Sequence, residues 1–344
     1  MAALPVFPLG TRAAARRSPF ARRFARAARA APAAALPMVA SMFTFAFATD
    51  ANAHVLTAAD LASPRIGWVF TPWVVVLLVV SLGAYLIGYV RLQRRGARDR
   101  SARRVRLVMF AGGWLALAAV LVSPLDTLSG FLFSAHMVQH ETMMLVTAPL
   151  CVLGRPLTVW LWALPRSARL ALGAFVRSRA FSAAWRAISA PLVAWLLHAA
   201  ALWAWHAPTL FDAALANPAL HTLQHASFLV TALLFWWAIF GEGAQRRDSG
   251  HAMLSLFTTM MHTSALGALI TLAPTLWYPS YVEPTSTLGI NPLHDQQLGG
   301  LIMWVPGALA YLIGALAVCA RWLTGSSVPW LATRDAAARG SGLQ

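Results

Sequence analysis

The sequence predicts an all-α, polytopic membrane helical bundle with seven transmembrane helices after an N-terminal signal-like segment. Of the 344 residues, 59% are hydrophobic and only 11% are charged, which is typical of a chain whose main solvent is lipid. Seven apolar runs are long enough to cross a hydrocarbon core of about 30 Å as helices. The connections between these runs alternate between arginine-rich and arginine-free.

The first element is an arginine-rich leader, residues 1–53. Its first 30 residues carry seven arginines and no acidic residue, and the apolar stretch ALPMVASMFTFAFA follows. A basic region, a short apolar stretch and the ending Ala51-Asn52-Ala53 have the form of a secretory signal cleaved before His54. The alternative is an uncleaved first helix, and in both cases His54 emerges outside the cytoplasm.

A short outer segment, residues 54–65, precedes a transmembrane domain at 66–320 and a cytoplasmic tail at 321–344. We expect the seven helices, in order, at residues 66–90, 107–124, 129–153, 187–205, 219–240, 251–272 and 298–320.

Arginine placement predicts the orientation of these helices. The connections after the first and third spans contain eight and six arginines, whereas those after the second, fourth and sixth contain none. Because cytoplasmic loops are enriched in basic residues, the mature chain is predicted to begin outside and to end in the cytoplasm. The net charge of +16 is therefore a topology signal, and we expect no nucleic-acid partner.

Absent and isolated residues exclude several functions. All 27 basic residues are arginine, so the chain has no lysine for a retinal Schiff base or a catalytic lysine. Cys151 and Cys319 form no CxxC pair and are expected to be buried small side chains. The sequence HETMM at 140–144 is not HExxH, so a zincin-type protease has no support. We expect a protein that is not an enzyme.

The histidines gather on one predicted side of the membrane. Eight of the ten are expected in the outer half or at the outer surface, and only His251 and His262 are not. Two pairs stand four residues apart within the motifs HMVQH (His136, His140) and HTLQH (His221, His225), so each pair presents two imidazoles on one helix face. The two motifs are interpreted as equivalent parts of repeated helical hairpins that need one gap to align.

These pairs predict a metal or haem site, because ionisable groups within a bilayer are functional by default. His206 and His294 are expected near the outer surface, with the thioethers of Met137 and Met303 and the carboxylate of Asp295 as further donors. Imidazole with thioether and carboxylate suits copper, with iron and zinc as alternatives. A lone histidine such as His198 more often bonds a neighbouring helix, and Glu141 is expected to face the bundle interior, either neutral or paired with an imidazole.

Three segments carry a family resemblance: residues 123–156, residues 205–237 and LHDQQLGGLIMWVPG at 293–307. They resemble the caa(3)-type cytochrome c oxidase assembly factor family of polytopic membrane proteins, called CtaG, over roughly Ile66 to Ala320. The resemblance implies a role in forming an active haem-copper oxidase by handling copper. The motif positions that it carries over are His136, Met137, His140, His206, His221, His225, Asp295, Gln296 and Met303, with Asp126 a looser match.

The leading functional hypothesis is an assembly factor in the cell inner membrane that receives copper at the outer face. Haem-copper oxidase subunits, periplasmic copper chaperones and membrane lipid are the expected partners. One alternative is an electron carrier with bis-histidine haem, which the same imidazoles could hold. A membrane di-iron enzyme with HxxxH boxes is the third hypothesis, and the outward topology argues against it.

Overall fold

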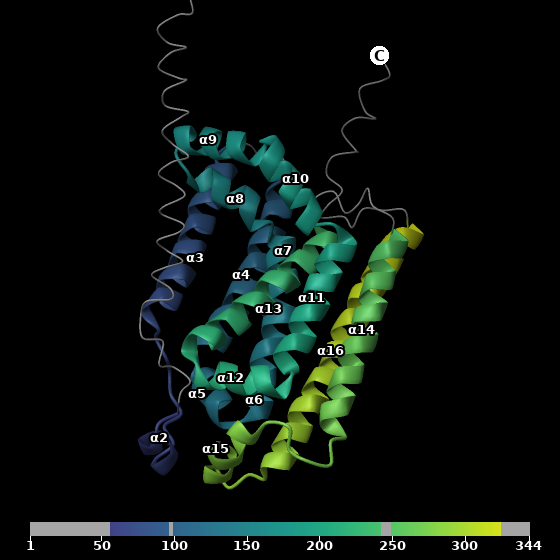
Figure 1. Ribbon diagram of the computed structural model, residues 1–344. Helices are drawn as coiled ribbons and strands as arrows, with labels where there is room; N and C mark the ends of the chain where they lie inside the picture. The colour runs from purple at the N-terminus through teal and green to yellow at the C-terminus, as the bar shows by residue number, and fades with distance from the viewer. Residues whose placement is uncertain (1–55, 96–98, 242–248, 325–344) are drawn as a thin grey trace, which may run out of the picture.

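The computed structural model describes residues 56–95, 99–241 and 249–324, and every regular element within them is a helix (Figure 1). The leader, His54, Arg246–Arg247 and most of the tail lie outside the described residues. The helices that run along the bundle are α3 (Pro72–Gln93), α4 (Arg100–Val122), α6 (Phe133–Glu141) continued by the π-helical turn η1 (Thr142–Thr147) and α7 (Ala148–Gly154), α11 (Pro191–His206), α13 (Pro218–Phe240), α14 (Ser249–Thr271) and α16 (Pro292–Thr324).

Shorter helices connect these elements. They are α2 (Ala58–Ala62), α5 (Pro124–Phe131), α8 (Pro156–Ala163), α9 (Arg166–Val176), α10 (Arg179–Ile188), α12 (Pro208–Ala216), η3 (Pro279–Tyr281) and α15 (Val282–Thr287). Several begin at proline, which lacks the N–H that the first turn of a helix leaves unpaired in any case.

Five of the described helices are individually long and apolar enough to cross a membrane: α3, α4, α13, α14 and α16. Two further spans are present if each of two bent pairs is counted as one. The run Phe133–Gly154 meets α8 at 55°, and α10 meets α11 at 60°. The first bend falls at Arg155, whose φ of 50° is left-handed, immediately before Pro156. The all-helical membrane class is thus confirmed, with five to seven candidate spans.

Some predicted boundaries are wrong by several residues. α16 begins at Pro292 rather than 298, so His294 and Asp295 lie in its first turns and not in a loop. The Asn291 side chain accepts the N–H groups of Leu293 and His294 at 2.9 and 3.1 Å and so caps the helix earlier than the apolar run suggests. The third predicted span begins at Phe133 rather than 129, because the extended residue Leu132 separates it from α5.

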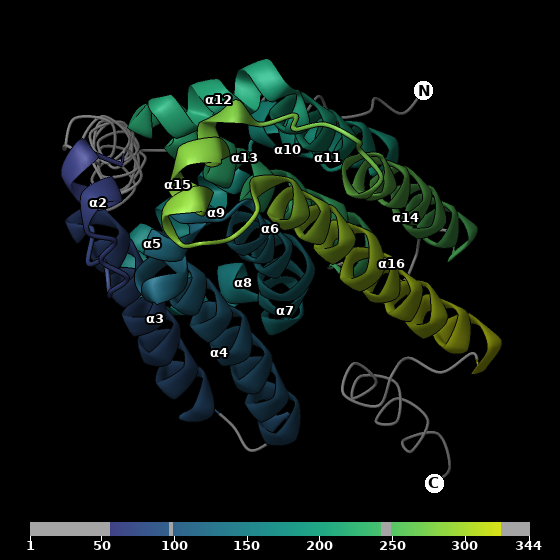
Figure 2. The same ribbon diagram turned by 90° about the horizontal axis from the view of Figure 1, so that it is seen from below.

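Small residues allow close packing of α14 against α16. A Cβ atom on Gly267 would lie 2.8 Å from the Trp304 nitrogen, and one on Gly300 would lie 2.6 Å from the Thr271 nitrogen. Small residues at helix contacts let backbones approach in membrane proteins, where packing contributes more than hydrophobic burial. The pair runs side by side along the edge of the bundle (Figures 1 and 2).

The π-helical turn η1 follows the histidine-bearing helix α6. In π geometry the Met144 carbonyl would accept the N–H of residue 149, but that residue is proline and has none. The indole N–H of Trp236 on α13 donates to this carbonyl at 2.9 Å instead. A buried carbonyl in a membrane needs such a partner, so this bond also fixes α13 against α6–α7.

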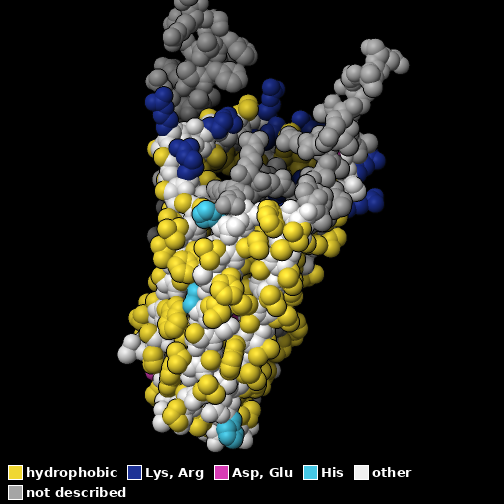
Figure 3. All heavy atoms as spheres, turned by 90° about the vertical axis from the view of Figure 1, so that its right-hand side faces the viewer, with side chains coloured by type: hydrophobic (Ala, Val, Ile, Leu, Met, Phe, Trp, Pro, Cys, Tyr) yellow, Lys and Arg dark blue, Asp and Glu magenta, His cyan; other side chains and the backbone are white. Residues whose placement is uncertain are grey.

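The two ends of the bundle differ in charge (Figure 3). We call the end with α8, α9, α10 and the α3–α4 connection the arginine end, and the opposite end with α5, α12 and α15 the histidine end. Dark-blue arginine side chains gather at the arginine end, while the sides between the ends are mostly apolar. The segments predicted to share one side of the membrane therefore do lie at one end of the bundle.

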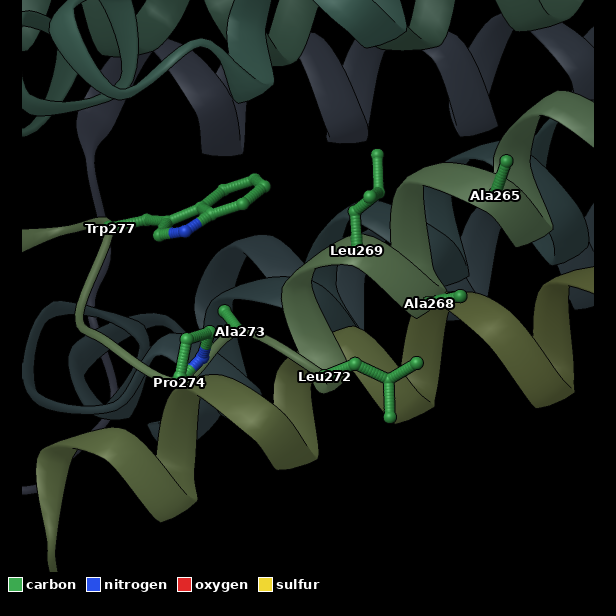
Figure 4. A pocket seen from close by; sticks show the side chains of 7 residues that line it. All are labelled: Ala265, Ala268, Leu269, Leu272, Ala273, Pro274 and Trp277. Atoms are coloured by element: carbon green, nitrogen blue, oxygen red, sulfur yellow. The ribbon is translucent and has the colours of Figure 1, made fainter.

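An apolar pocket opens near the end of α14 that leads into Trp277 (Figure 4). Its wall is formed by alanine, leucine and proline side chains from α14 and the residues after it, with the Trp277 indole opposite. Its lining includes no charged residue, as expected for a surface that faces lipid.

Candidate metal centre

Two helices bring the HxxQH motifs together at the histidine end. α6 carries His136 and His140, whose ring centroids lie 4.2 Å apart, and α13 carries His221 and His225 at 4.1 Å. Between the helices, the His136 and His221 rings are 5.3 Å apart, and the His140 and His225 rings 5.0 Å. The two motifs therefore form one cluster of four imidazoles.

Three of these imidazoles have spacing suited to one metal ion. One ring nitrogen from each of His136, His221 and His225 lies within 4.8 Å of the other two. Metal–imidazole bonds of about 2.0–2.1 Å separate the donors of a tetrahedral ion by about 3.3 Å. Small side-chain movements would bring the three nitrogens to that distance. His136 and His221 are buried and His225 is half-buried.

His206, at the end of α11, extends the cluster. Its ring centroid lies 6.4 Å from that of His140. Its Nδ1 lies 2.7 Å from the Leu202 carbonyl oxygen, which can only accept, so Nδ1 carries the proton and Nε2 the lone pair. This buried Nε2 has no hydrogen-bond partner among the described residues. An imidazole lone pair of this kind is the form that binds metal.

Two phenylalanines form the walls of the cluster. Phe211 of α12 packs beside His136 and His206, with centroids at 5.2 and 6.4 Å. Phe228 of α13 packs beside His140 and His206 at 4.6 and 5.9 Å. Both rings are fully buried, so they hold the imidazoles in place and exclude water from the space between them.

The connection between α14 and α16 covers the cluster and bonds three separate helices. Tyr278 donates to the His206 carbonyl at 2.9 Å, and Tyr281 donates to the Ser129 carbonyl at 2.8 Å. The Tyr281 oxygen also lies 3.1 Å from Nδ1 of His136. Burial raises the pKa of both hydroxyls above the usual range for tyrosine. Both groups therefore stay protonated and able to donate.

Two structurally repeated hairpins place the motifs at one depth. In each, a long helix leads into a short helix that begins at proline, α5 with eight residues and α12 with nine. One extended residue follows, and the next helix carries its first histidine, His136 or His221, as its fourth residue. The predicted repeat is confirmed, and the required gap is the extra residue of α12.

A third hairpin places Asp295 where the others have histidine. Asp295 is the fourth residue of α16. Its Oδ2 accepts the backbone N–H of Phe133 at 2.6 Å, and its Oδ1 accepts the Ser134 hydroxyl. The residue before α6 is Leu132, whose side chain cannot cap the helix. Asp295 was predicted as a metal ligand, but the structure directs both of its oxygens to the start of the histidine-bearing helix.

The remaining predicted donors are not among the clustered rings. His294 is exposed at the histidine end. Met137 and Met303 are buried in an apolar cluster with Phe133 and Phe211. The structure thus brings five of the nine predicted residues together as one group of rings, namely His136, His140, His206, His221 and His225.

These five histidines lie in a part of the chain that matches a known protein family. The family model described as "Cytochrome c oxidase caa3 assembly factor (Caa3_CtaG)" matches residues 83–325. The chain belongs to the Caa3_CtaG family. The matched range contains all five clustered histidines and the connection that covers them, so the centre lies within the part that defines the family.

Similar curated proteins come from mycobacteria and carry no assigned function. Uncharacterized proteins of Mycobacterium bovis and Mycobacterium tuberculosis are each 28% identical over 291 residues, covering 78% of this chain and 43% of theirs. One of Mycobacterium leprae is 27% identical over 251 residues, covering 71% and 38%. This Caa3_CtaG protein therefore spans less than half the length of those relatives. No solved structure matches it.

Several residues that contact the histidine cluster of this Caa3_CtaG protein were not predicted from the sequence. Tyr278, Tyr281 and Phe211 all touch the histidine cluster or the backbone beside it. The segment WYPSY at 277–281 combines three aromatic rings with a proline in an outer connection, which was the available signal. Its partners are 72 to 152 residues away in the chain, and no local pattern indicates them.

Gln139 of the first motif, and Glu141 directly after that motif, contact neighbouring helices. Gln139 donates to the Val120 carbonyl at 2.6 Å and to the Asp126 carboxylate at 2.8 Å, which ties α6 to α4 and α5. Glu141 lies toward α16, where a Cβ atom on Gly307 would be 3.3 Å from its Oε2. This contact with α16 agrees with the prediction that Glu141 faces the bundle interior.

Proposed function

We propose that this member of the cytochrome c oxidase assembly factor family handles copper, which it receives and passes on through the histidine cluster at the histidine end. The observation that carries the proposal is the group of five buried or half-buried imidazoles contributed by α6, α11 and α13. Neutral imidazoles suit transition metals, and the absence of carboxylate among the clustered rings disfavours magnesium and calcium.

The arrangement supports binding that remains reversible. His136, His221 and His225 would hold the ion, and His140 and His206 lie directly beside them. Because more imidazoles are present than one ion needs, a copper ion can exchange one ligand for another as it moves. The Phe211 and Phe228 walls keep water away during this exchange.

The bis-histidine haem alternative is less compatible with this geometry. The ring centroids of His140 and His206 lie 6.4 Å apart, a separation at which two imidazoles could hold an iron axially. Phe228 lies beside both rings, and the His136 and His225 rings lie 4.2 and 5.0 Å from His140. A flat macrocycle between the two rings would overlap these side chains.

The proposed function requires a defined orientation in the membrane and protein partners on its outer side. The histidine end faces outward from the cell inner membrane, so copper arrives from periplasmic chaperones and leaves to a haem-copper oxidase subunit. The supporting observation is the gathering of arginines at the opposite end, which the positive-inside rule assigns to the cytoplasm. Such a role transfers an ion and requires no catalytic group.

Metal analysis of the purified protein with an optical spectrum tests the proposal. We expect copper to be retained and no sharp haem absorption bands to appear. His136→Ala with His140→Ala should abolish copper retention and lower the copper content of the oxidase in cells. The control is His251→Ala, which removes a histidine at the start of α14, away from the cluster. It should leave the copper retention of the protein and the copper content of the oxidase unchanged.

The double substitution could also unfold the bundle, so a milder variant is needed. His225→Gln changes a half-buried ring and should weaken copper binding at nearly unchanged thermal stability. Wild-type protein that binds no copper, or histidine variants that leave oxidase copper unchanged, would contradict the proposal.

A further inference from the structure

One side chain outside the histidine motifs contacts a ring of the cluster through a hydrogen bond. The hydroxyl oxygen of Tyr281 lies 3.1 Å from Nδ1 of His136 and 2.8 Å from the carbonyl oxygen of Ser129. Tyr281 is only 2% exposed and His136 1%. Both contacts are therefore made away from bulk water, where a misplaced proton is costly.

The proton positions in this contact follow from chemistry. A backbone carbonyl cannot donate, so the single hydroxyl hydrogen of Tyr281 points to Ser129. The tyrosine oxygen must then accept from His136, which assigns the ring proton to Nδ1. The Ser129 carbonyl needs this donor because the chain turns out of α5 at Leu132, and the N–H of Phe133 is bonded to Asp295.

In this arrangement the lone pair of the neutral His136 imidazole is on Nε2, the nitrogen that would bind a metal. From it we infer that Tyr281 is a positioning residue, which holds His136 in the Nδ1-protonated form and orients its ring toward His221 and His225. The inference rests on the proposed copper function. A hydrogen bond to the second nitrogen of a metal-binding imidazole fixes both tautomer and ring orientation, and its loss typically lowers metal affinity 10–100-fold.

The chain offers a matched control for testing this role. Tyr278 lies in the same connection, is equally buried, and donates to a helix-terminal carbonyl, that of His206. Within the described residues, its hydroxyl makes no hydrogen bond to an imidazole nitrogen, in contrast to that of Tyr281. Tyr278→Phe and Tyr281→Phe therefore remove the same kind of hydroxyl–carbonyl bond, and only the second removes the contact with His136.

Copper(I) affinity, measured by competition with a chromophoric chelator, separates the two variants. Tyr281→Phe should weaken binding about 10–100-fold, whereas Tyr278→Phe should change it less than threefold. X-ray absorption of the copper-loaded proteins supplies a readout that a general loss of stability would not move. Tyr281→Phe should show a reduced histidine contribution around copper.

The outcomes distinguish this inference from the function on which it rests. If wild-type protein binds no copper, the proposed function fails. If wild-type protein binds copper and both tyrosine variants have equal affinity and equal absorption spectra, the copper function stands and the positioning role of Tyr281 is overturned.

A separate observation concerns α9 and α10, which lie across the arginine end (Figure 1). Neither helix has a buried residue. Trp185 of α10 packs against Trp237 of α13, with ring centroids 5.9 Å apart. The two helices thus form an extended surface at the boundary of the apolar zone.

Each helix has a basic face and an apolar face. On α10, Arg179 and Arg186 are seven residues apart and share one face, while Phe181, Trp185 and Ile188 share the other. On α9, Phe175 and Val176 are 44% and 41% exposed. The chain has no acidic residue between Thr142 and Phe211, so this segment supplies no internal counter-charge.

We propose that α9 and α10 bind anionic phospholipid headgroups, with their apolar faces in the acyl region. Charge complementarity selects this partner, because several exposed arginines beside apolar side chains match phosphate at a membrane surface. The exposed arginines concerned are Arg166, Arg177, Arg179 and Arg186.

Phosphatidylglycerol binding by the full chain in detergent, measured by native mass spectrometry, tests this surface. Replacing the four arginines by glutamine should lower phosphatidylglycerol affinity at least about tenfold and leave phosphatidylcholine binding unchanged. The control replaces Arg246, Arg247, Arg334 and Arg339, which removes equal charge elsewhere. Equal loss in the control, or no loss in the variant, would overturn the proposal.

Discussion

At the scale of single residues, two histidines of the centre are each held by a hydrogen bond from one ring nitrogen to the protein. His206 is bonded through Nδ1 to the Leu202 carbonyl, and His136 through Nδ1 to Tyr281. In both rings the protonated nitrogen is used by the protein, so Nε2 is the nitrogen left for an ion. The residues that define the chemistry are therefore only part of the site.

Asp295 is the residue whose role differs most from its sequence interpretation. We predict that Asp295→Ala lowers the free energy of unfolding by about 1–2 kcal/mol, because the first N–H groups of α6 lose their acceptor. Asp295→Asn keeps one oxygen for Phe133 and should cost less. Thermal and denaturant unfolding in detergent measure the loss of stability in each variant. The copper affinity of each variant is measured in parallel.

The stability measurement also decides between a cap and a ligand. Ser134→Ala removes only the hydroxyl donor to Asp295 and serves as a mild control. If Asp295→Asn lost copper binding while its stability equalled that of the wild type, the predicted ligand role of Asp295 would be supported over the capping role.

At the scale of elements, the bundle depends on close backbone contacts and on short breaks that turn helices. The fourth residue of α6, α13 and α16 lies at the histidine end in all three because each helix restarts after a short helical connection. Two of these positions are histidine and the third is the aspartate that stabilises the first helix.

The contact between α14 and α16 gives a prediction at this scale. We predict that Gly300→Val destabilises the protein by about 1–3 kcal/mol, because its Cβ would lie 2.6 Å from the Thr271 nitrogen and the helices would have to separate. Gly83→Ala on α3 is the control, since a Cβ there meets nothing within 4 Å. Its unfolding midpoint should stay equal or rise slightly. Equal destabilisation by both substitutions would exclude the packing explanation.

At the scale of the whole molecule, charge and chemistry are separated along the bundle. The described arginines other than Arg65 belong to the arginine end and its connections, and the five clustered histidines lie on α6, at the start of α13 and at the end of α11, in the opposite half. A protein that takes up an ion on one side of a membrane needs this polarity, because orientation during insertion follows the basic loops.

This polarity predicts the accessibility of the two ends in intact cells. In a background with Cys151 and Cys319 replaced by serine, His294→Cys should react with an impermeant thiol reagent added outside, since His294 is exposed at the histidine end. Arg177→Cys should react only after the membrane is permeabilised. The reverse labelling pattern would place the histidine end in the cytoplasm and contradict the proposed route of copper.

Much of the fold could be predicted because its signals are local. Apolar runs of sufficient length indicated the helices, and arginine placement indicated which connections share an end. Boundaries were less accurate where an isolated side chain decides them. Asn291 starts α16 six residues early, and Leu132 interrupts a continuous apolar run.

The sequence by itself determined the membrane class, the repeated hairpins and the two imidazole pairs, because helical periodicity and hydropathy act over neighbouring residues. Only the tertiary structure decided that α6 and α13 face each other, that His206 joins them, and that Asp295 and Tyr281 serve α6 from 145 to 162 residues away. Those contacts arise from packing. Buried backbone groups and imidazole nitrogens in a low-dielectric interior must find partners wherever the fold brings one within reach.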